Sequence, residues 1–231
     1  MPFFNSRKYL PITHVAICRS RTIAISNYSQ EVYEWGYRIG EKYGTHFEML
    51  YTLPGKCVEA QAGLEFSMYL LEDGSVWISG QISQGTEVVF SSAKHGQGEN
   101  PLVNLTDILA ENNPQVTSEN GKTPVIIKIS AGYSHAPLID EKGRIYTFGA
   151  GLIGQLGAGP EATSFWAPFE VTELSEGSDK VVLISAKANY SICYTECGII
   201  YYWGMLVPDD YDSIEYYPNF LTISIREEEY E

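Results

Sequence analysis

The chain has 231 residues, which is enough for one ordinary domain or one elongated β domain. With 15 Lys and Arg against 29 Asp and Glu, the formal net charge is -14. Such a surface repels a phosphate backbone, so nucleic acid is disfavoured as a partner. Hydrophobic residues make up 44% of the chain, which predicts a buried core and excludes global disorder.

The compartment is inferred from signals that the sequence lacks. Residues 1–8 do not have the basic-then-apolar order of a secretory leader. No apolar run approaches the ~18 residues that a membrane helix needs. Four cysteines in a chain of this length are not a disulfide scaffold. We therefore expect an intracellular protein with no membrane span, cytoplasmic rather than nuclear.

In chain order, one short unit occurs four times. In each copy an apolar run ends on an anchor glycine: Gly36, Gly80, Gly149 and Gly204. Three copies carry an aromatic residue directly before the anchor: Trp35, Phe148 and Trp203. Short apolar runs that are bounded by glycine and rich in β-formers predict strands joined by tight turns. The competing two-helix solenoid does not fit this pattern.

Two further spacings connect the copies. Three copies have a glycine six residues before the anchor: Gly74, Gly143 and Gly198. Two copies have a glycine seventeen residues before it: Gly63 and Gly132. The position fourteen residues before the anchor is filled by Thr22, Phe66, His135 and Tyr190. We interpret the glycines, the aromatic residues and His135 as positions that specify the fold.

A proline-led apolar run follows each anchor and supplies a candidate for a fourth strand. These runs begin at Pro54, Pro124, Pro168 and Pro218. Four-stranded sheets repeated at this period predict the blades of a β-propeller. The expected blades lie within a single repeat domain and span residues 13–53, 54–123, 124–167 and 168–221.

The second unit carries the largest insertion, residues 84–123. Within it, the segment 102–110 is expected to form a short helix. Residues 222–231 are predicted to be an acidic, solvated tail with no fold signal.

The third copy resembles the regulator of chromosome condensation repeat. The residues that carry the resemblance are Ser130-Ala131-Gly132-x-x-His135, Gly143, Tyr146-x-Phe148-Gly149 and Gly154-Gln155-Leu156-Gly157. That family folds as a β-propeller, usually of seven blades, so the resemblance implies an all-β propeller. The second and fourth copies carry about half of the pattern, and the first copy is the weakest.

Four blades are fewer than the usual ring of the resembled family. They form either a partial, open arc or a closed four-bladed ring. An open arc leaves two blade faces uncovered, which exposes apolar surface unless a partner covers it. We expect the open arc, completed by a protein partner or by a second copy in a dimer.

Three motifs that suggest chemistry are explained better by the repeat. Gly149–Gly154 spells Gly-x-Gly-x-x-Gly, but dinucleotide binding requires a helix directly after the strand. Cys193 and Cys197 lack the second pair that a zinc site needs. The acidic runs 209–212 and 227–229 lack the spacing and the turn glycine of a calcium loop. We therefore predict no catalytic, cofactor-binding or metal-binding residue.

The function predicted from these features is a non-enzymatic protein-protein interaction scaffold. The insertion 84–123 is its most individual candidate for a contact element, because loops of repeat folds vary freely. The resemblance implies an alternative, a guanine-nucleotide exchange regulator of a small GTPase, which is the role of the founding member of that family. A structural subunit of a large assembly is a third possibility.

Overall fold

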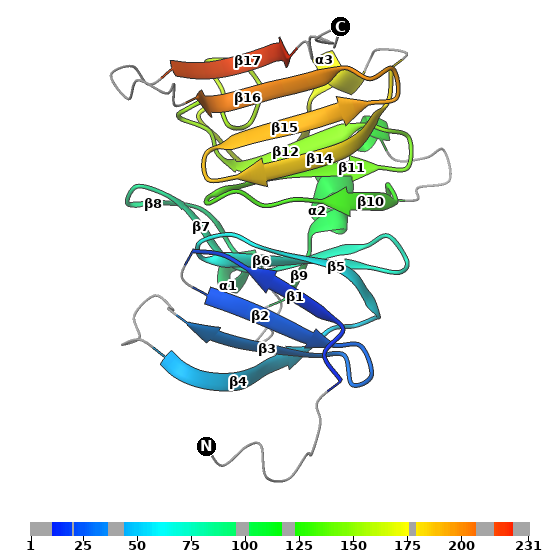
Figure 1. The fold of residues 1–231 in the computed structure, drawn as a ribbon, viewed down its shortest axis with the longest axis vertical. Helices are drawn as coiled ribbons and strands as arrows, with labels where there is room; N and C mark the ends of the chain where they lie inside the picture. The colour runs from blue at the N-terminus through cyan, green and yellow to red at the C-terminus, as the bar shows by residue number, and fades with distance from the viewer. Residues whose placement is uncertain are drawn as a thin grey trace, which may run out of the picture.

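The computed structural model describes residues 11–19, 21–36, 44–95, 102–116, 123–175, 179–206 and 215–223. Their strands form four antiparallel sheets, each built from consecutive strands (Figure 1). The first sheet contains β1 (His14–Ile17), β2 (Arg21–Ser26), β3 (Glu31–Gly36) and β4 (Gly44–Thr52). The second contains β5 (Cys57–Ala62), β6 (Phe66–Leu71), β7 (Val76–Gln84), β8 (Glu87–Ser91) and the short β9 (Val103–Asn104). The third contains β10 (Ile126–Ile129), β11 (His135–Asp140), β12 (Ile145–Ala150) and β13 (Ser164–Glu170). The fourth contains β14 (Val181–Lys187), β15 (Tyr190–Thr195), β16 (Ile200–Leu206) and β17 (Glu215–Ile223).

The sheets are the blades of an open propeller arc. The first strand of each sheet packs against that of the next, in the order β1, β5, β10 and β14 (Figure 1). Within the described ranges, the first and fourth sheets do not pack against each other. The prediction of an all-β, open arc is therefore confirmed, and the alternative of a closed four-bladed ring is wrong. Each sheet buries its apolar faces against its neighbours only, which leaves the two end sheets with one uncovered face each.

Two expected boundaries differ from the strands that the structure shows. β13 runs through Pro168 to Glu170, so the boundary between residues 167 and 168 falls inside a strand. β13 is the outer edge of its sheet, where a proline without an N–H is tolerated. β8 lies inside the expected insertion 84–123 and is the fourth strand of its own blade. Of the expected acidic tail, residues 222 and 223 belong to β17, and the remainder lies outside the described residues.

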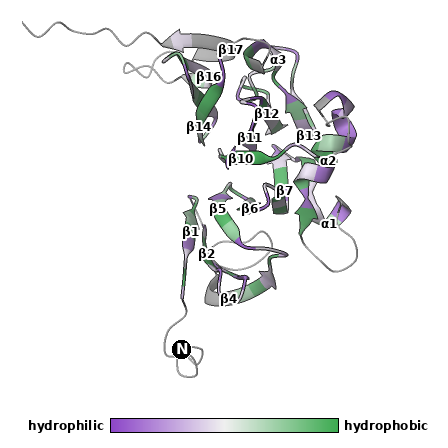
Figure 2. Ribbon diagram, turned by 90° about the vertical axis from the view of Figure 1, so that its right-hand side faces the viewer, coloured by the Kyte–Doolittle hydropathy of each residue, from purple (hydrophilic) through white to green (hydrophobic). Residues whose placement is uncertain are grey.

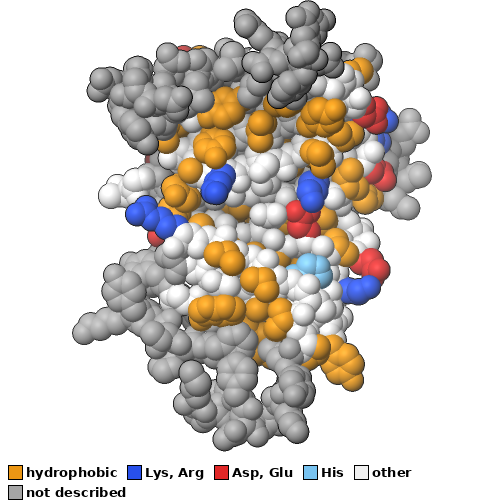
Figure 3. All heavy atoms as spheres, viewed as in Figure 1, with side chains coloured by type: hydrophobic (Ala, Val, Ile, Leu, Met, Phe, Trp, Pro, Cys, Tyr) orange, Lys and Arg blue, Asp and Glu red, His pale blue; other side chains and the backbone are white. Residues whose placement is uncertain are grey.

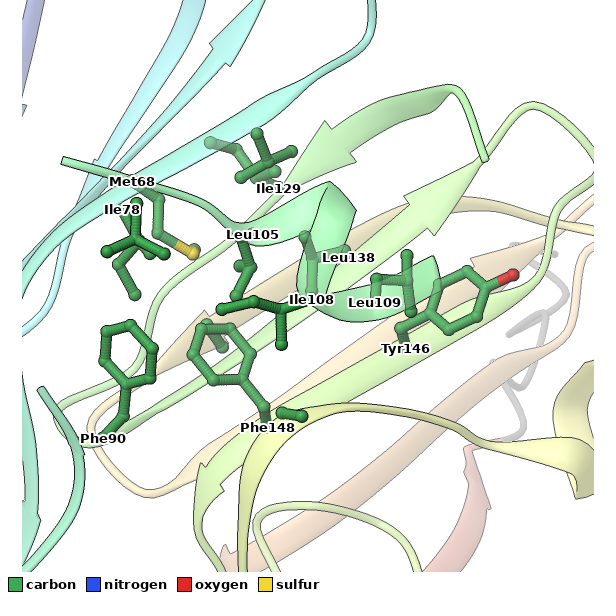
Figure 4. Packing of buried hydrophobic residues seen from close by; sticks show 14 of the residues in the cluster. Met68, Ile78, Phe90, Leu105, Ile108, Leu109, Ile129, Leu138, Tyr146 and Phe148 are labelled. Atoms are coloured by element: carbon green, nitrogen blue, oxygen red, sulfur yellow. The ribbon is translucent and has the colours of Figure 1, made fainter. Parts of the chain in front are cut away.

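The short helix predicted in the insertion is confirmed as α2 (Leu105–Asn112). The side chain of Asn104 caps it by accepting hydrogen bonds from the backbone N–H groups of its first turn. Leu105 and Leu109 are buried between the second and third blades (Figure 4), and the Asn113 amide donates to Pro168 O at 2.8 Å. This part of the insertion is core packing, in contrast to the contact element that we expected there. Residues 96–101 and 117–122 of the insertion lie outside the described residues.

Three shorter helical segments complete the described secondary structure. They are α1 (Ser92–His95), the 3-10 turn η2 (Pro114–Val116) and α3 (Thr172–Ser175). Figure 2 shows α1 and α2 on the opposite side of the arc from β1 and β14.

The four anchor glycines share a backbone conformation that other residues rarely adopt. The φ angles of Gly36, Gly80, Gly149 and Gly204 are 118°, 96°, 110° and 102°. A Cβ atom at Gly149 would lie 2.4 Å from Ser134 O and 2.8 Å from His135 Cα. The anchor therefore needs glycine both for its positive φ and for its close approach to the neighbouring strand.

One position links each blade to the next. It is the residue that pairs with the anchor glycine across the second and third strands, occupied by Arg21, Phe66, His135 and Tyr190. In the first blade this residue is Arg21, so the alignment of Thr22 with His135 is wrong by one residue. The cause is the turn of the first blade, residues 27–30, which is one residue longer than the turn 141–143 of the third blade.

Two of these linking residues make equivalent polar contacts to a serine of the following blade. Arg21 Nη2 donates to Ser67 Oγ at 2.8 Å, and its Nη1 forms a buried ion pair with Glu34 at 3.3 Å. His135 Nε2 lies within hydrogen-bond distance, 2.9 Å, of Ser191 Oγ. Both serines directly follow the linking position of their own blade, so the contact repeats the same geometry at two blade interfaces.

At the interface between the second and third blades, the contact at this position is apolar. Phe66 of the second blade belongs to the same buried cluster as Ala136, which directly follows His135 in the third blade. The linking residue is thus buried at all three interfaces.

Burial has a strong effect on His135. Its side chain is fully buried, and desolvation lowers its pKa from 6.5 to about 3. The unfolded chain therefore binds more protons than the folded chain between about pH 6.5 and pH 3. The stability that comes from keeping this imidazole neutral is fully present above pH 6.5 and is lost as the pH falls through that window.

We expect His135→Gln to remove this part of the pH dependence. Between pH 6.5 and pH 5 the wild type should lose about 1.7 kcal/mol of unfolding free energy that the variant does not lose. Urea unfolding at both pH values measures the difference. His14→Gln, which removes a partly exposed imidazole elsewhere in the chain, is the matched substitution for comparison. An unchanged slope in His135→Gln would contradict this account.

Gly149→Ala should destabilise the fold by about 3 kcal/mol, because the new Cβ meets backbone atoms at an unfavourable φ. Gly85→Ala is the matched control. Gly85 also has a positive φ, 61°, but a Cβ there meets nothing within 4 Å, so we expect a loss of only about 1 kcal/mol. Denaturant unfolding of the two variants separates close packing from backbone strain, and equal losses would show that the close approach is unimportant.

Candidate functional site

The glycine-rich loop after β12 is a connection between strands. No helix occurs in residues 151–163, all of which the structure describes. The backbone N–H of Gly151 donates to Thr163 O at 2.8 Å and to Gln84 Oε1 at 3.0 Å. The Gly-x-Gly-x-x-Gly run thus lacks the strand-to-helix geometry in which a helix N-terminus holds a pyrophosphate.

The cysteines lie apart from one another. Cys18, Cys57, Cys193 and Cys197 are all free thiols. Burial raises the pKa of Cys57 and of Cys193 to about 12, so both remain protonated and unreactive at neutral pH. In the described part of the chain, no three His, Cys, Asp or Glu residues are grouped so that they could hold a metal ion. The acidic runs 209–212 and 227–229 lie outside the described residues.

The uncovered blade faces are the most distinctive surface of the molecule. We call the face of a blade that points toward the next blade its forward face, and the opposite one its backward face. In the first three blades the forward face is buried by the following blade. The fourth blade has an open forward face, and the first blade has an open backward face.

The open forward face exposes positions that are buried elsewhere. Tyr194 is 40% exposed, whereas the residues at the same register in the other blades, Ile25, Leu70 and Ile139, are at most 3% exposed. Leu183, paired with Tyr194 on β14, is 55% exposed. Tyr190 is partly buried on this face and stacks on Tyr202 with ring centroids 5.7 Å apart. An aromatic and aliphatic surface thus lies where a fifth blade would pack.

The open backward face shows the same contrast on β1. Val15 is 56% exposed, whereas Ile129 and Ile184, at the same register, are 0% and 6% exposed. Ile17 is 72% exposed, whereas Ala62 and Ala186 at its register are both 8% exposed. The remaining counterparts, Ala60 and Ala131, are partly buried. The exposure of Val15 and Ile17 therefore follows from the position of the blade in the arc, because their counterparts are buried or partly buried wherever a preceding blade exists.

Both open faces lie on the same side of the molecule. Figure 3 shows apolar side chains gathered over β14–β16 and again over β1–β3, with charged side chains between the two groups. Contiguous apolar surface of this kind marks interaction sites in soluble proteins. No helix in the described ranges is long and apolar enough to span a bilayer.

Sequence reasoning identified uncovered blade faces in general but not the residues that form them. The alternation of side chains along each strand was visible in the sequence. The missing information was the register, which decides which half of the alternation points forward. A one-residue slip in a strand exchanges the two faces, and the first blade carries such a difference at Arg21.

Comparison with known proteins agrees with this architecture. The model of the regulator of chromosome condensation (RCC1) repeat matches residues 142–194, which run from the third blade into the fourth. The chain is 26% identical over 202 residues to the ultraviolet-B receptor UVR8 of Arabidopsis thaliana, covering 84% of the chain and 41% of the receptor. It is 39% identical over 80 residues to a bifunctional serine/threonine-protein kinase/NEDD4-like E3 ubiquitin-protein ligase of Dictyostelium discoideum, covering 34% of the chain and 4% of that protein.

Solved structures show the same fold at low sequence identity. Yeast RCC1 (Prp20) bound to Kap60 matches with a TM-score of 0.72 and 16% identity, over 98% of this chain and 52% of that one. Prp20p of Saccharomyces cerevisiae, studied for its binding to Gsp1p and histones, matches with a TM-score of 0.69 and 17% identity, over 98% and 53%. The chain thus spans about half the length of these structures and less than half of the two relatives matched by sequence. The resemblance seen in the third copy is confirmed: the chain carries the regulator of chromosome condensation repeat, and its four sheets form an open arc of the RCC1-type β-propeller.

Proposed function

We propose that this chain is a non-enzymatic protein-interaction scaffold that binds another protein through its open blade faces. The observation that carries the proposal is the exposure of Tyr194, Val15 and Ile17 at positions whose counterparts in the other blades are buried or partly buried, beside the exposed Leu183 on β14. Removing a large aliphatic side chain from water contributes about 1.5 to 3 kcal/mol when burial is complete. A partner that covers these faces therefore gains binding free energy from surface that the rest of the propeller already uses for packing.

The charge of the chain and its free thiols support an intracellular protein as the partner. A net charge of -14 disfavours nucleic acid. All four thiols are free, which supports our proposal that the scaffold works inside the cell, and we place it in the cytoplasm rather than the nucleus.

A guanine-nucleotide exchange regulator of a small GTPase is the second candidate. The observation that favours it is the fold shared with Prp20p, a protein studied for its binding to Gsp1p. Fold alone does not establish function, and this chain spans about half of that structure. A structural subunit of a large assembly would use the same open faces as a scaffold.

The scaffold proposal is tested by native affinity purification followed by mass measurement of the intact complex. We expect the wild type to be isolated in a complex of discrete mass. Leu183→Asp combined with Tyr194→Asp should lose that complex, because a desolvated charge opposes docking on an apolar face. Leu152→Asp is the matched control, since Leu152 is 66% exposed on the loop after β12 and lies on neither open face.

Two results would overturn the proposal. One is a complex that survives the double variant unchanged, which would place binding elsewhere. The other is clear acceleration of nucleotide release from a small GTPase in a panel assay, which would replace a pure scaffold by an exchange regulator.

A further inference from the structure

We propose that the fourth blade is a detachable unit, and that acid releases it from the third blade by adding a proton to His135 at the interface between them. The contact concerned joins a buried imidazole on β11 to Ser191 on β15. This inference goes beyond the proposed function, because it concerns how the chain holds its own blades together and its test needs no partner.

The imidazole has no place for a second proton while the interface is closed. Its Nε2 lies 2.9 Å from Ser191 Oγ. Its Nδ1 is buried and forms no hydrogen bond within the described residues, and the ring packs so closely on Gly132 that a Cβ atom there would overlap it. Both nitrogens of an imidazolium are donors. A protonated His135 would therefore be a buried charge with one unsatisfied N–H group.

No carboxylate in the described part of the chain forms an ion pair with this ring. Lys128 on β10 is paired with Glu59, and Lys187 at the end of β14 is exposed. Asp140 ends the strand that His135 begins, roughly 16 Å further along it, and binds the turn that follows. The other titratable side chains on the elements around the ring are tyrosines and one cysteine: Tyr133, Tyr146, Tyr190, Cys193 and Tyr194.

Release of the blade lets the imidazole take up its proton in water. The ordinary pKa of the group is 6.5, whereas desolvation in the closed interface lowers the pKa to about 3. The open form therefore binds more protons than the closed form between these two values, and a fall in pH favours the open form. Between pH 6.5 and pH 5 the opening constant, which is the ratio of open to closed form, should rise about 16-fold.

The packing on either side of the third blade favours release of the fourth blade alone. The second and third blades share the largest buried cluster of the described residues, which includes the helix α2. The third and fourth blades share a smaller cluster with only the four-residue α3 beside it. Within the described ranges the fourth blade packs against the third. Once released it has no neighbour to cover its apolar faces, so it should lose its own sheet as well.

Labelling of two buried thiols measures opening at each end of the arc. Cys193 belongs to the cluster between the third and fourth blades, and Cys57 to the cluster between the first and second blades. Each is 1% exposed. A pyridyl disulfide reagent labels thiols in mild acid. The labelling rate of each cysteine, divided by its rate in the urea-unfolded chain at the same pH, gives its opening constant.

In the wild type we expect Cys193 to become accessible more often than the whole chain unfolds. Its opening constant should rise about 16-fold between pH 6.5 and pH 5, and His135→Gln should abolish most of that rise. Ser191→Ala keeps the imidazole but removes its partner. That variant should keep the rise, with a larger opening constant at both pH values. Cys57 is the internal control, because opening between the first and second blades leaves His135 buried.

Two results would overturn the proposal. One is a rise at Cys193 that persists undiminished in His135→Gln, which would show that another group senses the acid. The other is an opening constant of Cys193 equal to that of Cys57 and to that of global unfolding in urea, which would show that the arc unfolds as a whole. Circular dichroism verifies that the variants fold. Should His135→Gln fail to fold, the comparison of Cys193 with Cys57 and with global unfolding in the wild type and in Ser191→Ala decides.

Discussion

The packing of one blade face against the next is the constraint on which the rest of this structure depends. Every sheet has an apolar pattern on both faces, so no blade is stable with both faces in water. The residue at the linking position contributes to each of these contacts. It is an ion-paired arginine at Arg21, an aromatic ring at Phe66 and a neutral imidazole at His135. The three solutions differ chemically, but each fills the same place beside the anchor glycine.

The same constraint explains why we propose the ends of the arc as the interaction surface. An internal blade satisfies both faces, whereas the first and fourth blades satisfy one each. Side chains such as Val15 and Tyr194 keep the apolar character of their buried counterparts. A surface that only faced water would have no physical reason to keep it. In contrast, the helix α2 of the insertion packs in the core between the second and third blades (Figure 4).

Much of the fold could be predicted from the sequence, because glycine and aromatic spacings record local backbone requirements. Each anchor glycine was correctly placed in a strand, although Gly80 and Gly204 lie inside their strands and not at the ends. The segment around Leu105 was correctly expected to be helical. The sequence did not reveal the extra turn residue that shifts Arg21 into register, since a one-residue difference in a polar turn leaves the apolar pattern almost unchanged. It also misplaced the boundary at Pro168, because a proline at the edge of a sheet does not end the strand. The open faces were expected as a class, but their residues required the register.

Hydroxyl-radical footprinting of the assembled protein tests the central claim most directly, because it measures the solvent access of individual side chains. The account predicts that Leu183, Tyr194, Val15 and Ile17 are protected in the isolated complex relative to the free chain. Leu152 should remain equally reactive in both. Unchanged oxidation of the four face residues in any assembled state would contradict the claim that the open blade faces are the site of interaction.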